Sequence, residues 1–186
     1  EDKSVNQLVL TGDSETFDNT IWLAPFKPRT SRIVLLAPKG QKQDSELEYY
    51  IERAFQSVPE HRVELIQSQT EAWKPLAALK GIDLWIVTRP LNDSVTEGLR
   101  EHVKKGGIIL MPLTSVTMQN TLQVIWEDPA LVIEEAAVTD YSLIGKIDFQ
   151  HPLFAPFADP RFSNFSKIHF WKHRRILNLD LSQEEL

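Results

Sequence analysis

The sequence predicts an α/β protein built on a three-layer, mostly parallel, doubly wound sheet, with a β-hairpin in front of it. Short apolar runs alternate along the chain with amphipathic segments of helical spacing. Residues 32–37 are apolar almost without interruption, which is typical of a strand covered by helices on both faces. The connections between the runs are long enough for the right-handed crossovers that parallel strands require.

The N-terminal part predicts the hairpin. Residues 6–10 and 19–24 are short β-forming runs, and the turn-forming residues between them include Gly12. Two prolines then stiffen the connection to the rest of the chain. We therefore expect a boundary near residue 28, with a hairpin appendage over 1–28 and an α/β domain over 29–186.

Strands and helices alternate in the rest of the chain. After the strand at 32–37, an amphipathic helix is expected over 44–57, where Asp44 or Ser45 is the N-cap and Glu48 completes a capping box. The elements expected after it are a strand at 62–66, a short helix at 72–79, a strand at 83–88, a helix at 92–105, a strand at 107–112, the segment 119–126, and strands at 131–136, 144–149 and 175–181.

The helix over 92–105 has a clear predicted face and end. Val95, Leu99 and Val103 recur at helical spacing and are expected to face the sheet. Gly106 and Gly107 follow directly and are expected to terminate the helix, because glycine readily adopts the left-handed conformation found after helix ends.

The charge balance and the lack of cysteine exclude several classes of function. Lys and Arg number 20 against 26 Asp and Glu, a net charge of −6, so we expect no nucleic-acid partner. With no cysteine, the chain has no disulfide, thiolate metal site or cysteine nucleophile. No run approaches the roughly 18 apolar residues of a membrane span. The chain begins at Glu1 rather than Met, and we expect it to be part of a longer protein.

The loops that follow the predicted strands nominate a ligand site, because ligands of open parallel sheets collect at the carboxyl ends of strands. Lys39 and Arg89 are placed to hold an anion, with the amino end of the helix near Asn92 adding partial positive charge. Thr114 and Ser115 follow the strand at 107–112 and complete the candidate set. The alternative, that these are ordinary solvated loop residues, stays open.

Several catalytic and metal motifs are missing from the sequence. Neither phosphate-binding glycine motif occurs, and Ser115 lacks the flanking glycines of a nucleophile elbow, so we interpret its hydroxyl as a helix N-cap or turn group. His169 and His173 have the spacing of a helical metal pair, but the strand-like run after them disfavours a helix there. We expect no metal and no cofactor.

The most unusual segment is 147–175, IDFQHPLFAPFADPRFSNFSKIHFWKHRR, which contains six of the nine phenylalanines and three prolines. Aromatic side chains interleaved with basic ones are one pattern of single-strand nucleic-acid binding, but the acidic chain opposes that interpretation. Because proline fixes an extended backbone, we expect this segment to wrap over a sheet edge or to dock a partner.

Three stretches of the chain resemble the extracytoplasmic part of large bacterial membrane proteins related to the BatA group of aerotolerance operons; they read FDNTIWLAP, GGIILMP and DFQHPLFAPFADPRFSNFSKIHFWKHRRI. Those proteins typically carry transmembrane helices, a von Willebrand factor A-type domain and a β-sandwich, followed by a domain similar to class I glutamine amidotransferases. The resemblance covers most of the chain. It implies a flavodoxin-like or class I glutamine amidotransferase-like fold, with the hairpin as the last part of the preceding sandwich.

The resemblance also implies that the amidotransferase chemistry is lost. An active enzyme of that class carries a Cys on the tight turn after a central strand, which corresponds here to residues 112–116, where no Cys occurs. His151 with Pro152 is similar to the His-Pro that precedes the acidic triad member, but Leu153 stands where a Glu is expected. Without a nucleophile, the histidine has nothing to activate.

We therefore expect a non-catalytic binding or scaffolding domain of a membrane-anchored envelope protein, extracytoplasmic (periplasmic) in location, whose partners are proteins or other domains of the same chain. Its membrane attachment would come only from segments outside this chain. Two alternatives stay open: a small-molecule hydrolase using Ser115, His151 or Arg89, and an anion- or sugar-binding domain at the strand ends. The free edges of a two-stranded hairpin also predict a homodimer through residues 6–24.

Overall fold

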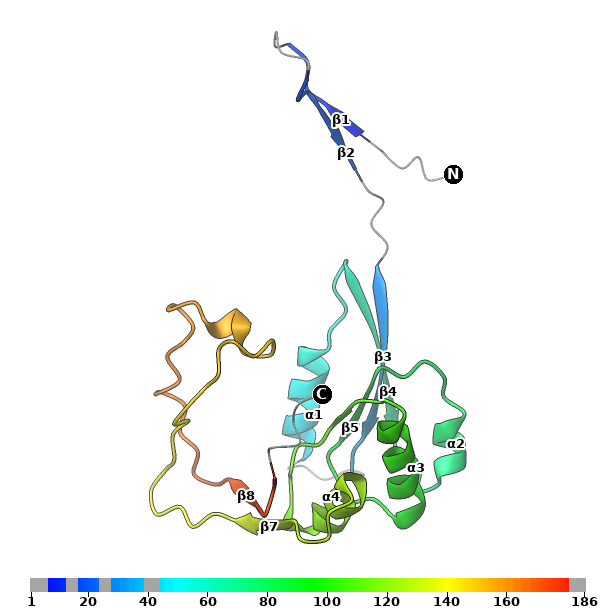
Figure 1. Cartoon of the computed structure of the whole chain (residues 1–186), viewed down its shortest axis with the longest axis vertical. Coiled ribbons are helices and arrows are strands. Elements are labelled where there is room, and N and C mark those ends of the chain that lie inside the picture. The colour runs from blue at the N-terminus through cyan, green and yellow to red at the C-terminus, as the bar shows by residue number, and fades with distance from the viewer. Residues whose placement is uncertain (1–6, 13–16, 24–27, 39–43, 181–186) are drawn as a thin grey trace.

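A computed structural model describes residues 7–12, 17–23, 28–38 and 44–180 of the chain. Its centre is a four-stranded sheet with the order β4-β3-β5-β6, in which every neighbouring pair is parallel (Figure 1). This confirms the prediction of an α/β protein with a parallel sheet. The strands are β3 (Arg29–Leu36), β4 (His61–Ser68), β5 (Leu84–Val87) and β6 (Ile109–Leu110).

Helices cover both faces of this sheet, because the side chains of a strand point alternately to opposite faces. On one face, Ile33 and Leu35 of β3 pack with Ile51 of the first helix. On the other face, Val34 and Leu36 pack in a cluster that the other helices complete. The helices are α1 (Asp44–Ala54), α2 (Trp73–Ala77), α3 (Asp93–Lys104) and α4 (Gln119–Trp126).

Strand β3 is the centre of the sheet and the point where the strand order reverses. Residues 33–36 are at most 3% exposed, as expected for a strand covered on both faces. β3 pairs with β4 along its whole length and with β5 along its second half. The chain thus moves outward from β3 to β4 and crosses back to β5 on the other side. In open sheets, the carboxyl ends of the two strands at such a reversal flank the usual ligand crevice.

A smaller two-stranded antiparallel sheet follows α4. It pairs β7 (Val132–Glu135) with β8 (Arg174–Leu177), in general agreement with two of the predicted strands. Leu131 and Ile133 anchor this sheet, because both are buried in the same cluster as α2, α3 and α4. Its exposed acidic side chains are not isolated: Arg174 lies 2.6 Å from Glu135 in an ion pair, and Arg175 pairs with Glu134.

The prediction of a strand at 144–149 is wrong. Between β7 and β8 the described chain contains only one short 3-10 helix, η2 (Ala155–Phe157), and one isolated bridge between Ser142 and Phe170. Local turns take the place of the strand, because the side chains of Asp148, Asp159 and Asn164 each accept a hydrogen bond from the backbone N–H two residues later. Without a neighbouring strand, a β-forming run has no partner for its backbone groups.

The predicted N-terminal hairpin is present. β1 (Gln7–Val9) and β2 (Thr20–Trp22) pair antiparallel, and Figure 1 shows them beyond the end of the parallel sheet. Their large side chains are exposed: Leu8 by 56%, Ile21 by 62% and Trp22 by 74%. Among the described helices, none combines the length and the hydropathy that a membrane span needs.

Candidate functional site

The first candidate site is the set of loops at the carboxyl ends of the strands. Arg89 follows β5 and is only 9% exposed. Its guanidinium lies 2.8 Å from the carboxylate of Glu71 and donates at 3.2 Å to the carbonyl oxygens of Thr70 and Pro90. These contacts tie the loop after β5 to the loop after β4, so the side chain of Arg89 is already surrounded by acceptors of the protein itself.

Asn92 belongs to the same connection. It is the N-cap of α3, where its side-chain oxygen accepts a hydrogen bond from the Val95 N–H at 3.0 Å. Its side-chain nitrogen donates to the carbonyl and the carboxylate of Glu71. Lys39, the other half of the predicted anion site, lies outside the described residues. An anion held between Lys39 and Arg89 therefore stays a prediction.

The turn after β6 carries two hydroxyl groups, and both have partners. Thr114 donates at 2.7 Å to the carbonyl of Thr88 and so links the ends of β5 and β6. Ser115 is the N-cap of η1 (Val116–Met118), where its oxygen accepts from the Thr117 N–H at 3.2 Å and lies 2.8 Å from the Thr117 hydroxyl. This agrees with the interpretation of Ser115 as a capping residue.

His151 lies on an exposed turn within the segment between β7 and β8. Its Nδ1 accepts a hydrogen bond from the Leu153 N–H at 3.2 Å, and its ring lies 6.0 Å from that of Phe154. No hydrogen bond joins His151 to Ser115 in the part of the chain that is described. The structure therefore does not bring these two predicted site residues into a catalytic pair.

The segment between the two strands of the small sheet, residues 141–171, forms an exposed aromatic surface that we call the aromatic lobe. Its rings pack mainly on one another: Phe165 lies 5.8 Å from Phe157 and 6.3 Å from Phe149 between ring centroids. Figure 1 shows the lobe, in yellow and orange, extending away from the parallel sheet. None of its described side chains joins the core on either face of that sheet. The expectation that its phenylalanines cover the sheet edge is thus wrong.

The lobe leaves large apolar side chains in contact with solvent. Leu153 is 73% exposed, Phe162 59% and Trp171 65%. At its base, Tyr141 stacks on His169 with ring centroids 4.2 Å apart. His169 and His173 do not form a metal site with carboxylates, since no group of three or more metal-ligating side chains occurs among the described residues.

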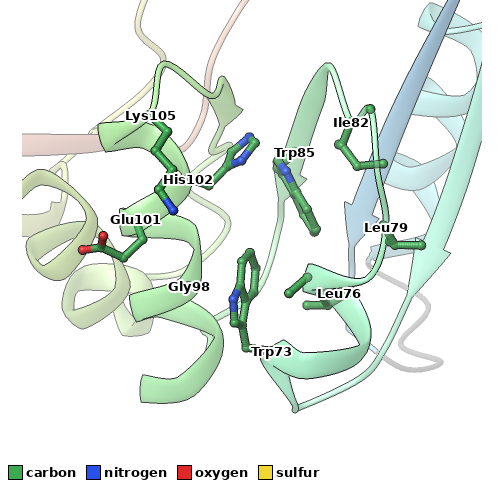
Figure 2. Close-up of a pocket in the computed structure, with 11 residues that line it drawn as sticks. Trp73, Leu76, Leu79, Ile82, Trp85, Gly98, Glu101, His102 and Lys105 are labelled. Atoms are coloured by element: carbon green, nitrogen blue, oxygen red, sulfur yellow. The ribbon is translucent and has the colours of Figure 1, made fainter.

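A second candidate site is a cavity of about 430 Å³ that lies between α2, α3 and the start of β5 (Figure 2). We call it the tryptophan cavity. The ring of Trp73 lies 5.7 Å from that of Trp85, which in turn lies 5.9 Å from His102, measured between ring centroids. The other residues that line it are Leu76, Ala77, Leu79, Gly81, Ile82, Gly98, Glu101 and Lys105.

Two glycines set the walls of this cavity. A Cβ atom on Gly98 would overlap the ring of Trp73, so the lack of a side chain allows the indole to lie directly against α3. A Cβ atom on Gly107 would likewise overlap the ring of His102. Gly106, with φ of +85°, turns the chain out of α3 and so places Gly107 over that ring.

Two buried polar atoms beside the tryptophan cavity have no partner among the described residues. Trp85 is 2% exposed, and its indole N–H has no hydrogen-bond acceptor among the described residues; the Nε2 of His102 is buried and unpaired in the same sense. Burial lowers the pKa of His102 from its ordinary value of 6.5, and the nearby charge of Lys105 lowers it further. Both effects favour the neutral form of the imidazole.

Sequence reasoning did not identify this cavity. Val95 and Leu99 are buried as predicted, but Val103 is 36% exposed, and the half-buried His102 packs its ring against Trp85 instead. The spacing does not separate the two residues, because His102 and Val103 lie three and four residues after Leu99 and both spacings share a helix face. Comparison of the chain with protein-family models, curated protein sequences and solved structures gives no match.

Proposed function

We propose that this chain is a non-catalytic binding or scaffolding domain of a larger, membrane-anchored bacterial envelope protein, located outside the cytoplasm. The observation that carries the proposal is the turn after β6. The sequence has no cysteine, and the hydroxyls of Thr114 and Ser115 are both engaged in hydrogen bonds that organise the turn. A domain similar to class I glutamine amidotransferases would use this turn for its nucleophile, and here both hydroxyls of the turn stabilise the fold through hydrogen bonds.

The strand order supports the finer part of the proposal, a flavodoxin-like or glutamine amidotransferase-like fold. The order β4-β3-β5-β6, with α1 on one face and α2 and α3 on the other, is the beginning of the doubly wound order seen in flavodoxin-like sheets. Folds of this kind carry many unrelated functions, so the function has to be argued from the surfaces of this chain.

The surface we propose for partner binding is the aromatic lobe. Exposed aromatic and aliphatic side chains are typical of protein interfaces, where they supply most of the buried apolar area. Lys146 and Lys167 lie in the lobe and form no ion pair among the described residues. Of its two carboxylates, Asp159 is already paired with Arg161 at 2.6 Å and only Asp148 has no ion pair among those residues, so positive charge is in excess. The lobe therefore presents apolar groups with unpaired positive charge, and the partner we propose is a protein surface that is both apolar and acidic.

Site-specific photo-crosslinking in cells that produce the full-length protein tests this assignment. A crosslinker replaces Leu153 or Phe162 in the lobe, and in the matched control it replaces Tyr50 of α1, which is 67% exposed. We expect a discrete protein adduct from the two lobe positions and none from Tyr50. The charge change Lys167→Glu should weaken the lobe adducts, because it opposes an acidic partner. Equal adducts from all three positions, or none from the lobe, would contradict the proposal.

A separate measurement tests the lack of catalysis. Purified protein incubated with glutamine should release no more ammonia than the heat-unfolded protein does, because no nucleophile is free in the turn after β6. Release of ammonia that the substitution Ser115→Ala abolishes would overturn the non-catalytic assignment. Crosslinking results do not depend on this outcome, so the two halves of the proposal fail separately.

A further inference from the structure

We propose that the aromatic lobe binds the N-terminal hairpin of a second copy of this chain. The inference rests on the proposed function, in which the lobe is the partner-binding surface, and it identifies the partner. Three features support it: an exposed aliphatic face on the hairpin, an apolar hollow in the lobe, and the opposite charges of the two segments.

The hairpin has an aliphatic face. Leu8 of β1 and Ile21 of β2 lie opposite one another in the ladder. Leu10 lies on the same face, two residues after Leu8, and its N–H continues the ladder by donating to the carbonyl of Asn19 at 2.8 Å. All three aliphatic side chains are more than half exposed. Because a two-stranded hairpin alone is only marginally stable in water, covering this face with another apolar surface would stabilise it.

The lobe has a hollow that suits such side chains. Its volume is about 290 Å³, and its walls include the aliphatic side chains of Leu143 and Ile144 and the rings of Phe149 and Phe165. Leu143 and Ile144 are themselves exposed, so the apolar lining is open to a partner. Lys146 lines the same hollow. Apolar side chains that fill a pocket of the partner are the ones that contribute most to binding at protein interfaces.

The two segments have opposite charge. Residues 1–28 contain five acidic and two basic residues, a net charge of −3, and the loop between the hairpin strands, 11–19, contains three acidic residues and no basic one. The lobe contains three basic and two acidic residues, a net charge of +1, and neither Lys146 nor Lys167 forms an ion pair among the described residues. The hairpin is therefore apolar and acidic, which is the chemistry proposed for the partner of the lobe.

Charge also argues against the other contact that a second copy offers. Hairpin against hairpin would bring two acidic segments together, whereas hairpin against lobe brings opposite charges together. Figure 1 shows the hairpin beyond the end of the parallel sheet and the lobe at the side of that sheet, so the two segments lie apart within one copy. Each copy thus presents one hairpin and one lobe, and two copies can cover both through a reciprocal pair of contacts.

Sedimentation equilibrium of the unaltered chain and of four variants tests the inference. Ile21→Glu places a charge on the aliphatic face of the hairpin, and Ile144→Glu places one in the hollow. Each should weaken self-association about tenfold or more, because the charge would be buried in the contact. The matched controls are Thr20→Glu, on the opposite face of the hairpin, and Tyr50→Glu, on α1. They should stay within about threefold of the unaltered chain.

Mixing the two variants separates the proposed contact from a contact between hairpins. Ile21→Glu keeps an intact lobe and Ile144→Glu keeps an intact hairpin, so an equimolar mixture should form a pair that neither variant forms alone. If Ile144→Glu associates as well as the unaltered chain does while Ile21→Glu does not, the hairpins pair with one another and the inference is overturned. Should Ile144→Glu not fold, Lys167→Glu makes the same test through an exposed side chain.

Failure of this inference is distinguishable from failure of the proposed function. A chain that stays monomeric at about 1 mM overturns the inference. If the lobe of that monomeric chain still forms a crosslink to a different protein in cells, the proposed function stands with another partner. If the inference is correct, the adduct from Leu153 or Phe162 consists of two copies of this protein, and removal of the hairpin abolishes it.

Discussion

Replacing Gly98 by alanine should destabilise the protein, although the same change would stabilise an isolated helix. In a helix interior, alanine is favoured over glycine by about 1 kcal/mol. In this structure, however, the new Cβ would overlap the ring of Trp73. Any shift of that ring away from the new Cβ disturbs its packing against Trp85, which is 2% exposed. The two effects therefore oppose one another at a single position.

The magnitude follows from comparing the two terms. Forcing an additional carbon into a packed site typically costs about 1 to 3 kcal/mol, and a rigid indole with a second indole behind it places Gly98 toward the upper end of that range. Subtracting about 1 kcal/mol of helix propensity leaves a net loss of about 1 to 2 kcal/mol in the free energy of unfolding.

Urea unfolding followed by far-ultraviolet circular dichroism measures the change. Ser94→Ala, on the exposed face of the same helix, is the control and should stay within about 0.5 kcal/mol of the unaltered protein. In a Trp73→Leu background the clash is relieved, so Gly98→Ala should become neutral or stabilising. If Gly98→Ala stabilises the protein with Trp73 present, the indole does not lie against α3 and the proposed wall of the cavity is wrong.

Three further predictions follow from the same structure. Arg89→Ala should lower the free energy of unfolding by about 2 kcal/mol, because it removes the buried side chain that bonds the loop after β4 to the loop after β5, whereas Glu71→Gln should cost less since Glu71 is largely exposed. Equal losses in urea unfolding would contradict this. The pKa of His102 is lowered in the folded state, so the unfolded chain takes up the proton first and the free energy of unfolding should fall as the pH drops below about 6.5. His102→Gln should reduce that loss of stability between about pH 7 and pH 5, which thermal melts would measure. Removing the hairpin by starting the chain at Pro28 should convert a dimer into a monomer in sedimentation. A shortened chain that keeps the oligomeric state of the unaltered chain would refute a dimer formed through the hairpin.

Local sequence patterns were sufficient for most of the elements. Apolar runs and helical periodicity predicted the order of strands and helices, because each depends on which side chains along a short stretch face the same direction. The N-cap role of Ser115 was similarly predicted, since a cap depends on the few residues that follow it. The zero cysteine count alone excluded a thiol nucleophile.

The sites could not be predicted to the same extent, because they depend on residues from different elements. Arg89 was expected to be available to a ligand, and only the packed loops showed that Glu71 and Thr70 surround it. The strand expected at 144–149 had β-forming residues but no neighbouring strand to pair with. In both cases the local sequence was not sufficient, because the outcome depended on whether residues distant in sequence supplied a partner.

The sequence by itself determined that this chain folds as an α/β protein, and it excluded cysteine chemistry. Val95 and Leu99 are buried as the sequence predicts, and only the tertiary structure decided how that face of α3 ends, with Val103 36% exposed and the ring of His102 against that of Trp85. The physical reason is that helix periodicity tolerates a shift of one residue, whereas close packing does not. A cavity forms where Gly98 lets two elements approach, and that contact exists only in the folded chain.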